Sequence, residues 1–305
     1  MTDRVTVAAP AKINLQLGVG GVRADGFHTL ATVYQAIAVY DEVTVVSAPE
    51  TSLTVLGDGV DVSEVPTDGR NLAGRAAALL AQHAGLAPQE TAVAIEIRKR
   101  IPVAGGMAGG STDAAAALLA CDVLWKLDTP RDELLGLAAA LGSDVPFCLV
   151  GGTALGTGRG EVVDSVEDTG DYWWVVALSD RGLSTPSVFA EFDRRHAGAE
   201  VPEPTASEPL LAALAAGDVD ALAAALVNDL EAPALGLRPD LADLLRLGGE
   251  PPALARLLSG SGPTCLFLAA DEAGALAVRD RLRAAGTTAL VARAPAPGAH
   301  VLSAL

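Results

Sequence analysis

PVAGGMAGGSTD, from Pro102 to Asp113, is the segment that most restricts the fold of this chain. Its two glycine pairs let the backbone approach a ligand closely and adopt positive φ at little cost. The segment before it (91–101, TAVAIEIRKRI) is rich in β-branched residues and predicts a strand. The segment after it (114–125, AAAALLACDVLW) has the apolar pattern of a helix. The sequence therefore predicts a strand, a glycine-rich turn and a helix in succession.

The start of the predicted helix has the features of an anion site. Ser111, Thr112 and Asp113 are all N-cap residue types, so we expect the helix to begin after them. Free N–H groups and the positive dipole end at such a position bind phosphate groups. The glycine spacing excludes the dinucleotide-binding fingerprint, and a Walker A motif is excluded because no lysine precedes Ser111. A tight turn without a ligand is the alternative at this point.

The composition limits the class of protein. The chain has 305 residues, half of them hydrophobic, and a formal net charge of −17. Its length predicts one large or two ordinary domains, and no stretch approaches the roughly 20 uninterrupted apolar residues of a membrane span. The acidic excess argues against a nucleic acid partner, which would need a basic surface. Three widely spaced cysteines in apolar segments and an N-terminus without a signal-type apolar core predict buried thiols in a cytoplasmic protein.

The few cations are candidates for binding an anionic ligand. Residues 11–19 (AKINLQLGV) alternate as in a half-buried strand, which places Lys12, Asn14 and Gln16 on one face. Lys12 together with Asn14 is a better site candidate than a lone solvated lysine. Residues 98–100 (RKR) lie beside the glycine-rich turn, where a solvated strand end is an equally good interpretation.

The remaining segments predict the layout of the chain. Strands are expected at 4–9, 33–46, 52–56, 172–178 and 288–293, and helices at 71–84, 130–141, 208–216, 218–231, 239–247 and 271–285. Asn71 is a candidate N-cap. Asp144 follows the helix that ends at Leu141, at a corner that we expect to lead into a strand. An acidic linker (161–171) marks the boundary between an N-terminal domain, 1–160, and a second α+β domain, 161–305.

A turn near the N-terminus carries an aromatic residue beside a histidine. Asp25 and Gly26 predict the turn, and Phe27 and His28 follow directly. The pair could stack on a base and hydrogen-bond to its edge. Alternatively, Phe27 fills the core and His28 lies at the surface, and the residues alone favour this second interpretation.

Three separated segments together resemble the GHMP kinase superfamily, small-molecule kinases that lack a Walker A lysine. They are PAKINLQL (10–17), PVAGGMAGGSTDAA (102–115) and SGSGPTC (259–265). RADGFHTL (23–30) and LGSDVPF (141–147) resemble segments of those superfamily kinases that act in non-mevalonate isoprenoid biosynthesis. The alcohol substrate of these kinases carries a cytidine diphosphate group. The resemblance extends over nearly the whole chain.

This resemblance implies a two-domain α+β fold: an N-terminal nucleotide-binding α/β sandwich and a C-terminal ferredoxin-like domain, with the active site between them. It implies ATP-dependent phosphorylation of the 2-hydroxyl of the cytidyl substrate. Lys12 and Asp144 would be the catalytic pair, and Asn14 would align the hydroxyl. A carboxylate within hydrogen-bond reach can take the hydroxyl proton. Whether Asp144 is a general base or an orienting group stays open, since phosphoryl transfer depends largely on positioning and charge neutralisation.

The resemblance also implies the binding residues. Asn71 and Lys99 would lie near the adenosine, and Ser111 or Thr112 near Mg²⁺. His28 would hydrogen-bond to the edge of the base, and Phe27 and Phe189 would stack on it. Thr185 would line the same pocket. The resemblance therefore overturns the interpretation in which Phe27 fills the core and His28 lies at the surface. The residues that would wrap the ATP phosphates are Pro102, Val103, Ala104, Gly105, Gly106, Met107, Ala108, Gly109, Gly110, Ser111 and Thr112.

The sequence departs from its relatives at a few of these positions. Ala104 and Ala108 replace glycines often seen in the loop, so the loop geometry is expected to differ slightly. Phe27 stands where some relatives carry tyrosine, which keeps the stacking face and loses a hydroxyl. Neither change removes a group that the chemistry needs.

Two further hypotheses remain besides the cytidyl kinase. A GHMP kinase acting on homoserine, mevalonate or a sugar is disfavoured by Phe27, His28 and Phe189, because those substrates have no base to stack. A nucleotide-binding regulator without catalysis predicts a damaged Lys/Asp pair, and both Lys12 and Asp144 are present. The chain is expected to act on a small molecule, as a monomer or a homodimer.

Overall fold

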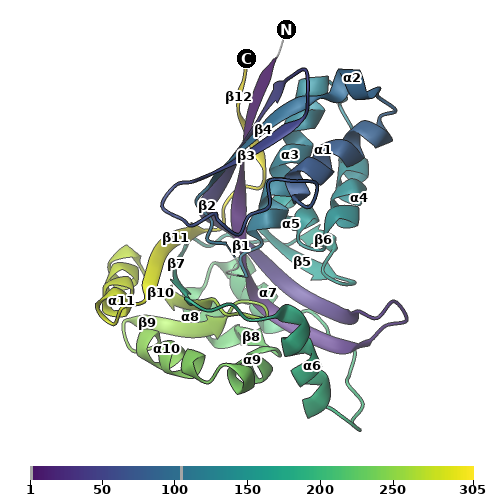
Figure 1. Ribbon diagram of the computed structural model, residues 1–305. Coiled ribbons are helices and arrows are strands. Elements are labelled where there is room, and N and C mark those ends of the chain that lie inside the picture. The colour runs from purple at the N-terminus through teal and green to yellow at the C-terminus, as the bar shows by residue number, and fades with distance from the viewer. Residues whose placement is uncertain (1–2, 104–105) are drawn as a thin grey trace.

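The computed structural model describes residues 3–103 and 106–305. Over these residues the chain forms an eight-stranded sheet, in which the order β12-β1-β2-β4-β3 is extended by β5, β6 and β8, and a separate four-stranded sheet. Figure 1 shows the larger sheet next to both termini and the smaller one at the other end of the molecule. The strands of the larger sheet are β1 (Arg4–Val22), β2 (His28–Ser47), β3 (Ser52–Gly57), β4 (Val93–Lys99), β5 (Thr153–Thr157), β6 (Val162–Ser165), β8 (Val227–Asn228) and β12 (His300–Ala304).

Strands β1 and β2 form one long antiparallel hairpin. The sequence predicted that Pro10 ends the first strand, and this is wrong. The pairing register shifts between Pro10 and Ala11, and such a bulge lets a strand continue past an irregular residue. The expectation of a half-buried strand is also wrong, because Lys12, Asn14 and Gln16 are as buried as the apolar residues between them. A polar row buried on a core strand needs partners, which makes it a site candidate.

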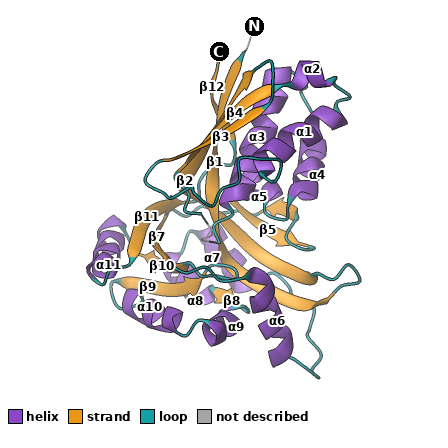
Figure 2. Cartoon of the chain, viewed as in Figure 1, coloured by secondary structure: helices purple, strands orange, loops and turns teal. Residues whose placement is uncertain are grey.

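Helices cover one face of the larger sheet, as Figure 2 shows. They are α1 (Leu72–His83), α2 (Pro88–Thr91), α3 (Gly109–Trp125), α4 (Arg131–Leu141) and α5 (Val145–Val150). The alanine-rich α3 lies inside this layer, where its small side chains pack against β1, β2 and α1 in a single apolar core. The predicted helices at 71–84 and 130–141 are confirmed, and Asn71 caps α1 by accepting a hydrogen bond from Ala73 N.

The smaller sheet has the strand order β11-β7-β10-β9 and is antiparallel throughout. Its strands are β7 (Tyr172–Leu178), β9 (Ala253–Leu258), β10 (Cys265–Ala269) and β11 (Thr288–Ala294). With α11 between β10 and β11, this order is that of a ferredoxin-like domain, so the predicted α+β class with its two parts is confirmed. The helices of this half are α6 (Thr185–Arg195), α7 (Glu208–Ala216), α8 (Val219–Ala225), α9 (Glu231–Leu237), α10 (Asp240–Gly248) and α11 (Glu272–Ala284).

The C-terminal half contributes strands to the larger sheet across the predicted boundary at 160/161. β6 pairs with β5, β8 pairs with β1, and β12 returns to the edge of β1. Strand β6 lies within the segment predicted as an acidic linker (161–171), so that part of the linker prediction is wrong. Strands β8 and β12 were not predicted either, and the predicted helix at 218–231 is interrupted where β8 pairs with β1. The division at 160/161 stays a prediction.

The described residues contain no helix that is long and apolar enough to cross a membrane. Cys121, Cys148 and Cys265 are buried free thiols, as the sequence predicted. Burial raises the pKa of all three thiols, the pKa of Cys148 and that of Cys265 to about 12 each.

Candidate active site

One cavity of about 950 Å³ lies where the two halves meet. From the N-terminal half it is lined by β1, by the glycine-rich segment before α3 and by the turn before α5. From the C-terminal half it is lined by α6 and by the turn between β9 and β10. The cavity therefore brings together all three segments on which the resemblance to GHMP kinases rests.

Lys12 and Asp144 form an ion pair in the wall of this cavity. Lys12 Nζ lies 3.6 Å from Asp144 Oδ2 and donates to Asn14 Oδ1 at 2.9 Å. Asn14 Nδ2 in turn donates to Thr32 Oγ1 at 2.7 Å, which fixes the orientation of the amide. The Lys12 side chain is 8% exposed and that of Asp144 is 31% exposed, so the carboxylate is the more accessible partner.

Tyr34, a residue that the sequence analysis did not single out, holds the other oxygen of the carboxylate. Its hydroxyl donates to Asp144 Oδ1 at 3.1 Å, and its ring stacks on Phe147 of α5. Burial, followed by the charge of Asp144, raises the pKa of Tyr34 well above its ordinary value, so the hydroxyl stays a donor. Asp144 is thereby oriented from two sides, by Lys12 and by Tyr34.

Asp144 does not lead into a strand, as the sequence predicted. It occupies the N-cap position of the short helix α5, with φ −86° and ψ −14°. Pro146 lies in the first turn of that helix, where its missing N–H is not needed. The expected strand after Asp144 is therefore wrong, and Pro146 belongs to the start of a helix.

The turn between β9 and β10 closes the cavity from the C-terminal half. A Cβ at Gly260 would lie 3.2 Å from Asn14 Oδ1, which is tighter than an ordinary contact, and its φ of +57° also favours glycine. Asn228 Nδ2 holds the turn by donating to the carbonyls of Leu258 and Gly260, each at 2.7 Å. Ser261 Oγ lies 2.7 Å from Thr185 Oγ1 at the start of α6.

The glycine-rich segment follows the cavity wall and ends at the N-terminus of α3. Its described residues that line the cavity are Pro102, Val103, Gly106, Met107, Ala108, Gly109, Gly110 and Ser111. The predictions for Ala104 and Gly105 lie outside the described residues. The first N–H groups of α3 have no acceptor within the helix, so they can bind an anion there.

The start of α3 differs from the prediction. The helix begins at Gly109, not after Asp113, and Ala108 precedes it with φ 60° and ψ 27°. A left-handed conformation costs a non-glycine residue about 1–2 kcal/mol. Ser111, Thr112 and Asp113 therefore lie in the first turns of the helix, and none of them is its N-cap.

Two predicted ATP-binding residues face away from the cavity. The Thr112 hydroxyl is buried and donates to Pro10 O at 2.9 Å. The Asn71 side chain is occupied by the cap of α1 and by Pro66 O, to which its Nδ2 donates at 2.8 Å. Neither residue lines the cavity.

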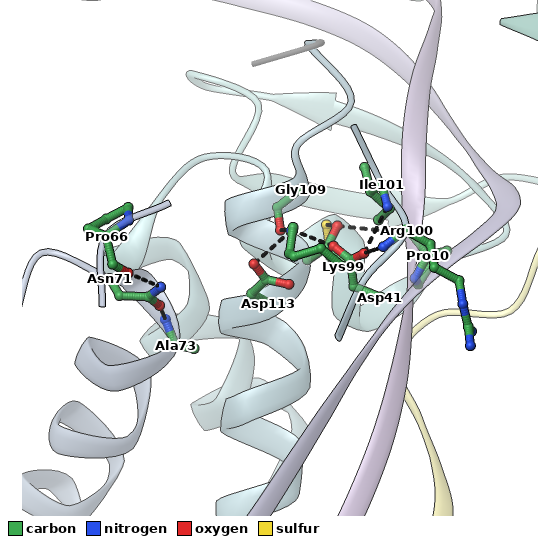
Figure 3. A network of polar contacts seen from close by, with 12 residues as sticks. Pro10, Asp41, Pro66, Asn71, Ala73, Lys99, Arg100, Ile101, Gly109 and Asp113 are labelled. Carbon is green, nitrogen blue, oxygen red and sulfur yellow. Dashed lines mark hydrogen bonds and ion pairs between the residues drawn. The ribbon is translucent and has the colours of Figure 1, made fainter. Parts of the chain in front are cut away.

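Lys99 lines the cavity wall but is held by a buried polar cluster, drawn in Figure 3. Its Nζ forms ion pairs with Asp41 Oδ2 and, at 2.8 Å, with Asp113 Oδ2, and it donates to Gly109 O at 3.1 Å. An ammonium has three N–H groups, so these contacts account for all of them. In this conformation Lys99 ties β4 to the start of α3.

The two carboxylates of this cluster have different surroundings. Asp41 Oδ1 accepts two backbone N–H groups, from Arg100 at 2.6 Å and Ile101 at 2.8 Å. Asp113 Oδ1 is buried without a partner in the described residues. Burial raises the pKa of Asp113 to about 8, despite the opposing charge of Lys99. Burial lowers the pKa of Lys99, but Asp113 and Asp41 outweigh this and raise it above its ordinary value.

An aromatic group lies at the far end of the cavity, where the β1–β2 hairpin meets α6. The His28 ring stacks on Phe189, with centroids 4.9 Å apart. His28 Nδ1 contacts Gly20 O at 2.9 Å, and its Nε2 lies 3.4 Å from Asp193 Oδ1. Phe27 is half exposed in the turn. Thus Phe27, His28, Phe189 and Thr185 line one end of the cavity that also contains Lys12.

Comparison with known proteins agrees with this arrangement. The model of the GHMP kinases N terminal domain matches residues 71–152, and that of the GHMP kinases C terminal domain matches 210–288. A curated protein of Streptomyces avermitilis, 4-diphosphocytidyl-2-C-methyl-D-erythritol kinase, is 58% identical over 98% of this chain and 99% of its own length. The chain belongs to the GHMP kinase family. A kinase of the same name from Mycobacterium tuberculosis is 52% identical over 99% of this chain and 94% of its own length.

Two solved kinase structures have the same fold. The crystal structure of 4-(cytidine 5'-diphospho)-2C-methyl-D-erythritol kinase superposes with a TM-score of 0.75 at 32% identity, covering 94% of this chain and 98% of the other. A homoserine kinase from Cytophaga hutchinsonii superposes with a TM-score of 0.74 at 19% identity, over 99% of this chain and 98% of the other. At that identity the homoserine kinase supports the fold alone.

Proposed function

We propose that this GHMP kinase transfers the γ-phosphoryl group of ATP to the 2-hydroxyl of 4-diphosphocytidyl-2-C-methyl-D-erythritol. The product is the 2-phosphate, an intermediate of non-mevalonate isoprenoid precursor biosynthesis in the cytoplasm. The main support is that one cavity holds a Lys/Asp pair, a helix N-terminus and an aromatic group. Curated relatives at 52–58% identity over nearly the full chain bear the name of this kinase.

Four residues of the cavity have separate roles in the proposed reaction. Asp144 accepts the proton of the substrate hydroxyl while the new P–O bond forms. Lys12 offsets the negative charge that develops on the hydroxyl oxygen. Asn14 aligns the acceptor through its contact with Lys12, and Tyr34 holds the other carboxylate oxygen so that Asp144 keeps its orientation.

ATP and Mg²⁺ fit the remaining wall of the cavity. The segment from Gly106 to Ser111 lines the cavity and includes the start of α3. The N–H groups there would donate hydrogen bonds to the phosphates. The Ser111 hydroxyl lines the cavity, and Asp113 Oδ1 is a buried oxygen without a partner in the described residues. Oxygen ligands are those that Mg²⁺ prefers, so Ser111 would hold the ion together with the phosphates. Bound Mg²⁺ neutralises the phosphates during transfer.

The aromatic end of the cavity is proposed to bind the cytosine. Phe27 and Phe189 offer stacking faces, His28 offers a ring edge, and Thr185 lies beside them. Each stacked aromatic contact with a base contributes about 1–3 kcal/mol. Homoserine, mevalonate and galactose have no base, so this part of the cavity would contribute nothing to their binding.

The test is the release of ADP from ATP and Mg²⁺ by the purified protein, with four acceptors in parallel. These are the diphosphocytidyl methylerythritol, homoserine, mevalonate and galactose. Turnover with the cytidyl substrate alone is the expected result. Turnover with another acceptor would overturn the roles of Phe27, His28 and Phe189. Measurable ATP binding without any turnover would favour a regulator.

A further inference from the structure

The tight turn between β5 and β6 carries a cation that the sequence analysis did not single out. Arg159 lies between Gly158 (φ 72°) and Gly160 (φ 101°), and its side chain lines the main cavity. The guanidinium lies over the Phe27 ring, with Cζ 4.9 Å from the ring centroid. Leu30 N donates to Gly158 O at 2.8 Å, which fixes the turn against β2.

The same turn also packs on Tyr34, the residue that orients Asp144. A Cβ at Gly160 would lie 2.3 Å from the Tyr34 hydroxyl, and that hydroxyl donates to Asp144. Arg159 is thus held at one side by the ring proposed to stack on the base. Its neighbour Gly160 lies against Tyr34, which contacts Asp144 at the site proposed to receive the alcohol. In a nucleoside diphosphate ester, the diphosphate lies between these two parts.

The charged side chains of the cavity also indicate that Arg159 can bind an anionic group. Among the described residues, three lysine and arginine side chains line it: Lys12, Lys99 and Arg159. Lys12 contacts Asp144 and Asn14, and the Nζ of Lys99 is fully occupied. Arg159 differs, because only its Nε contacts an acid, Glu161, at 3.4 Å. Nη1 and Nη2 form no hydrogen bond within residues 3–103 and 106–305, so they are free to donate to a ligand.

We propose that Arg159 binds the diphosphate of the cytidyl substrate and thereby sets its preference for a nucleoside diphosphate over a nucleoside. The inference rests on the proposed function. A guanidinium presents paired N–H groups that match phosphate oxygens, and the Phe27 ring favours the cation through its π face. A chain with net charge −17 needs such a local cation to attract an anionic substrate.

The experiment compares binding of cytidine, CMP and CDP by calorimetry in the wild-type protein and in Arg159→Gln. The wild type is expected to bind CDP more tightly than cytidine. Arg159→Gln is expected to lose about tenfold or more in CDP affinity and to bind cytidine unchanged, since hydrogen bonds to charged groups are worth that much. Arg159→Lys should keep part of the difference, and the CDP affinity of the wild type should fall with added salt.

Arg293→Gln is the matched control. Arg293 also lies over an aromatic ring, Trp173, and pairs with an acid, Asp171, but it does not line the cavity. This variant should bind CDP and cytidine as the wild type does. In turnover assays Arg159→Gln should raise the KM of the cytidyl substrate about tenfold and leave the KM of ATP unchanged.

The outcomes separate this inference from the proposed function. If Arg159→Gln binds CDP like the wild type, or loses cytidine and CDP affinity equally, Arg159 does not bind the diphosphate, while the kinase assignment stands. If the wild type binds none of the three cytidine compounds and turns over no cytidyl substrate, the proposed function fails, and this inference fails with it.

Discussion

Lys12 and Lys99 both lie against the cavity, and both are buried in the N-terminal half of the protein. Lys12 has one acid within reach, at 3.6 Å, and that acid is 31% exposed toward the cavity. Lys99 lies between two acids that are 3% exposed or less. The comparison shows that burial alone does not identify a catalytic lysine. What differs is whether the ammonium or its partner remains accessible to a ligand.

The largest expected effect is on stability, at Lys99. Lys99→Met leaves the Asp41 carboxylate buried without its cation, and breaking such a buried pair costs about 3–5 kcal/mol. We expect a matching fall in the free energy of unfolding, measured with a chemical denaturant. A loss of ATP affinity in a variant of unchanged stability would show instead that Lys99 is a ligand-binding residue.

The next effect is on turnover, at Lys12. Lys12→Met removes the cation beside the developing charge, and loss of one such group lowers kcat about 10²–10³-fold. Stability should change far less than in Lys99→Met, because the Asp144 carboxylate reaches the cavity. Lys126→Met, at a lysine away from the cavity, is the control and should alter neither property. Equal kcat values for the two variants would remove Lys12 from the mechanism.

The third prediction concerns pH and the third member of the Lys99 cluster. The folded protein holds the proton of Asp113 up to its pKa of about 8, whereas an unfolded aspartate loses it near pH 4. The folded state therefore binds more protons between these values, and the contribution of Asp113 to stability falls as the pH rises through this window. Asp113→Asn stays neutral, so its stability relative to the wild type should increase from pH 5 to pH 8.

The size of this effect follows from the linkage between pKa and stability. A difference of about 1.4 kcal/mol corresponds to one unit of pKa shift, and denaturant curves at the two pH values resolve it. If the variant is equally less stable at pH 5 and pH 8, Asp113 is ionised throughout and acts as an ordinary ion-pair partner of Lys99.

Local patterns predicted the regular elements well. The strand at 172–178 has the predicted bounds, and the helix at 130–141 is one residue shorter than predicted. Both depend on signals within the segment itself, namely an apolar run and a proline at the helix start. The Asn71 cap of α1 was predicted for the same reason.

Features that depend on distant partners were missed. β12 forms only by pairing with β1, almost 300 residues earlier, and its own sequence has little strand character. The early start of α3 at Gly109 could not be predicted, because it requires Ala108 in a left-handed conformation.

In the candidate site, too, residues with a local sequence signal were predicted and contacts between distant residues were not. Motif resemblance named Lys12, Asn14 and Asp144, whose roles stay proposals. Nothing in the sequence indicated that Tyr34 contacts Asp144, because 110 residues separate them. The partners of Lys99 were hidden similarly, since Asp41 lies 58 residues away. A residue type and its neighbours in sequence predict chemistry, whereas the tertiary fold decides which groups are already occupied.

The most direct test of the account is Asp144→Asn, assayed for turnover of the cytidyl substrate and for ATP binding. The amide keeps the shape of the side chain but cannot accept the hydroxyl proton. We predict that kcat falls at least about hundredfold, with ATP affinity nearly unchanged, because the phosphates bind at the start of α3. A variant that kept most of its kcat would contradict the assignment of Asp144 and, with it, the Lys12–Asp144 pair as the catalytic centre.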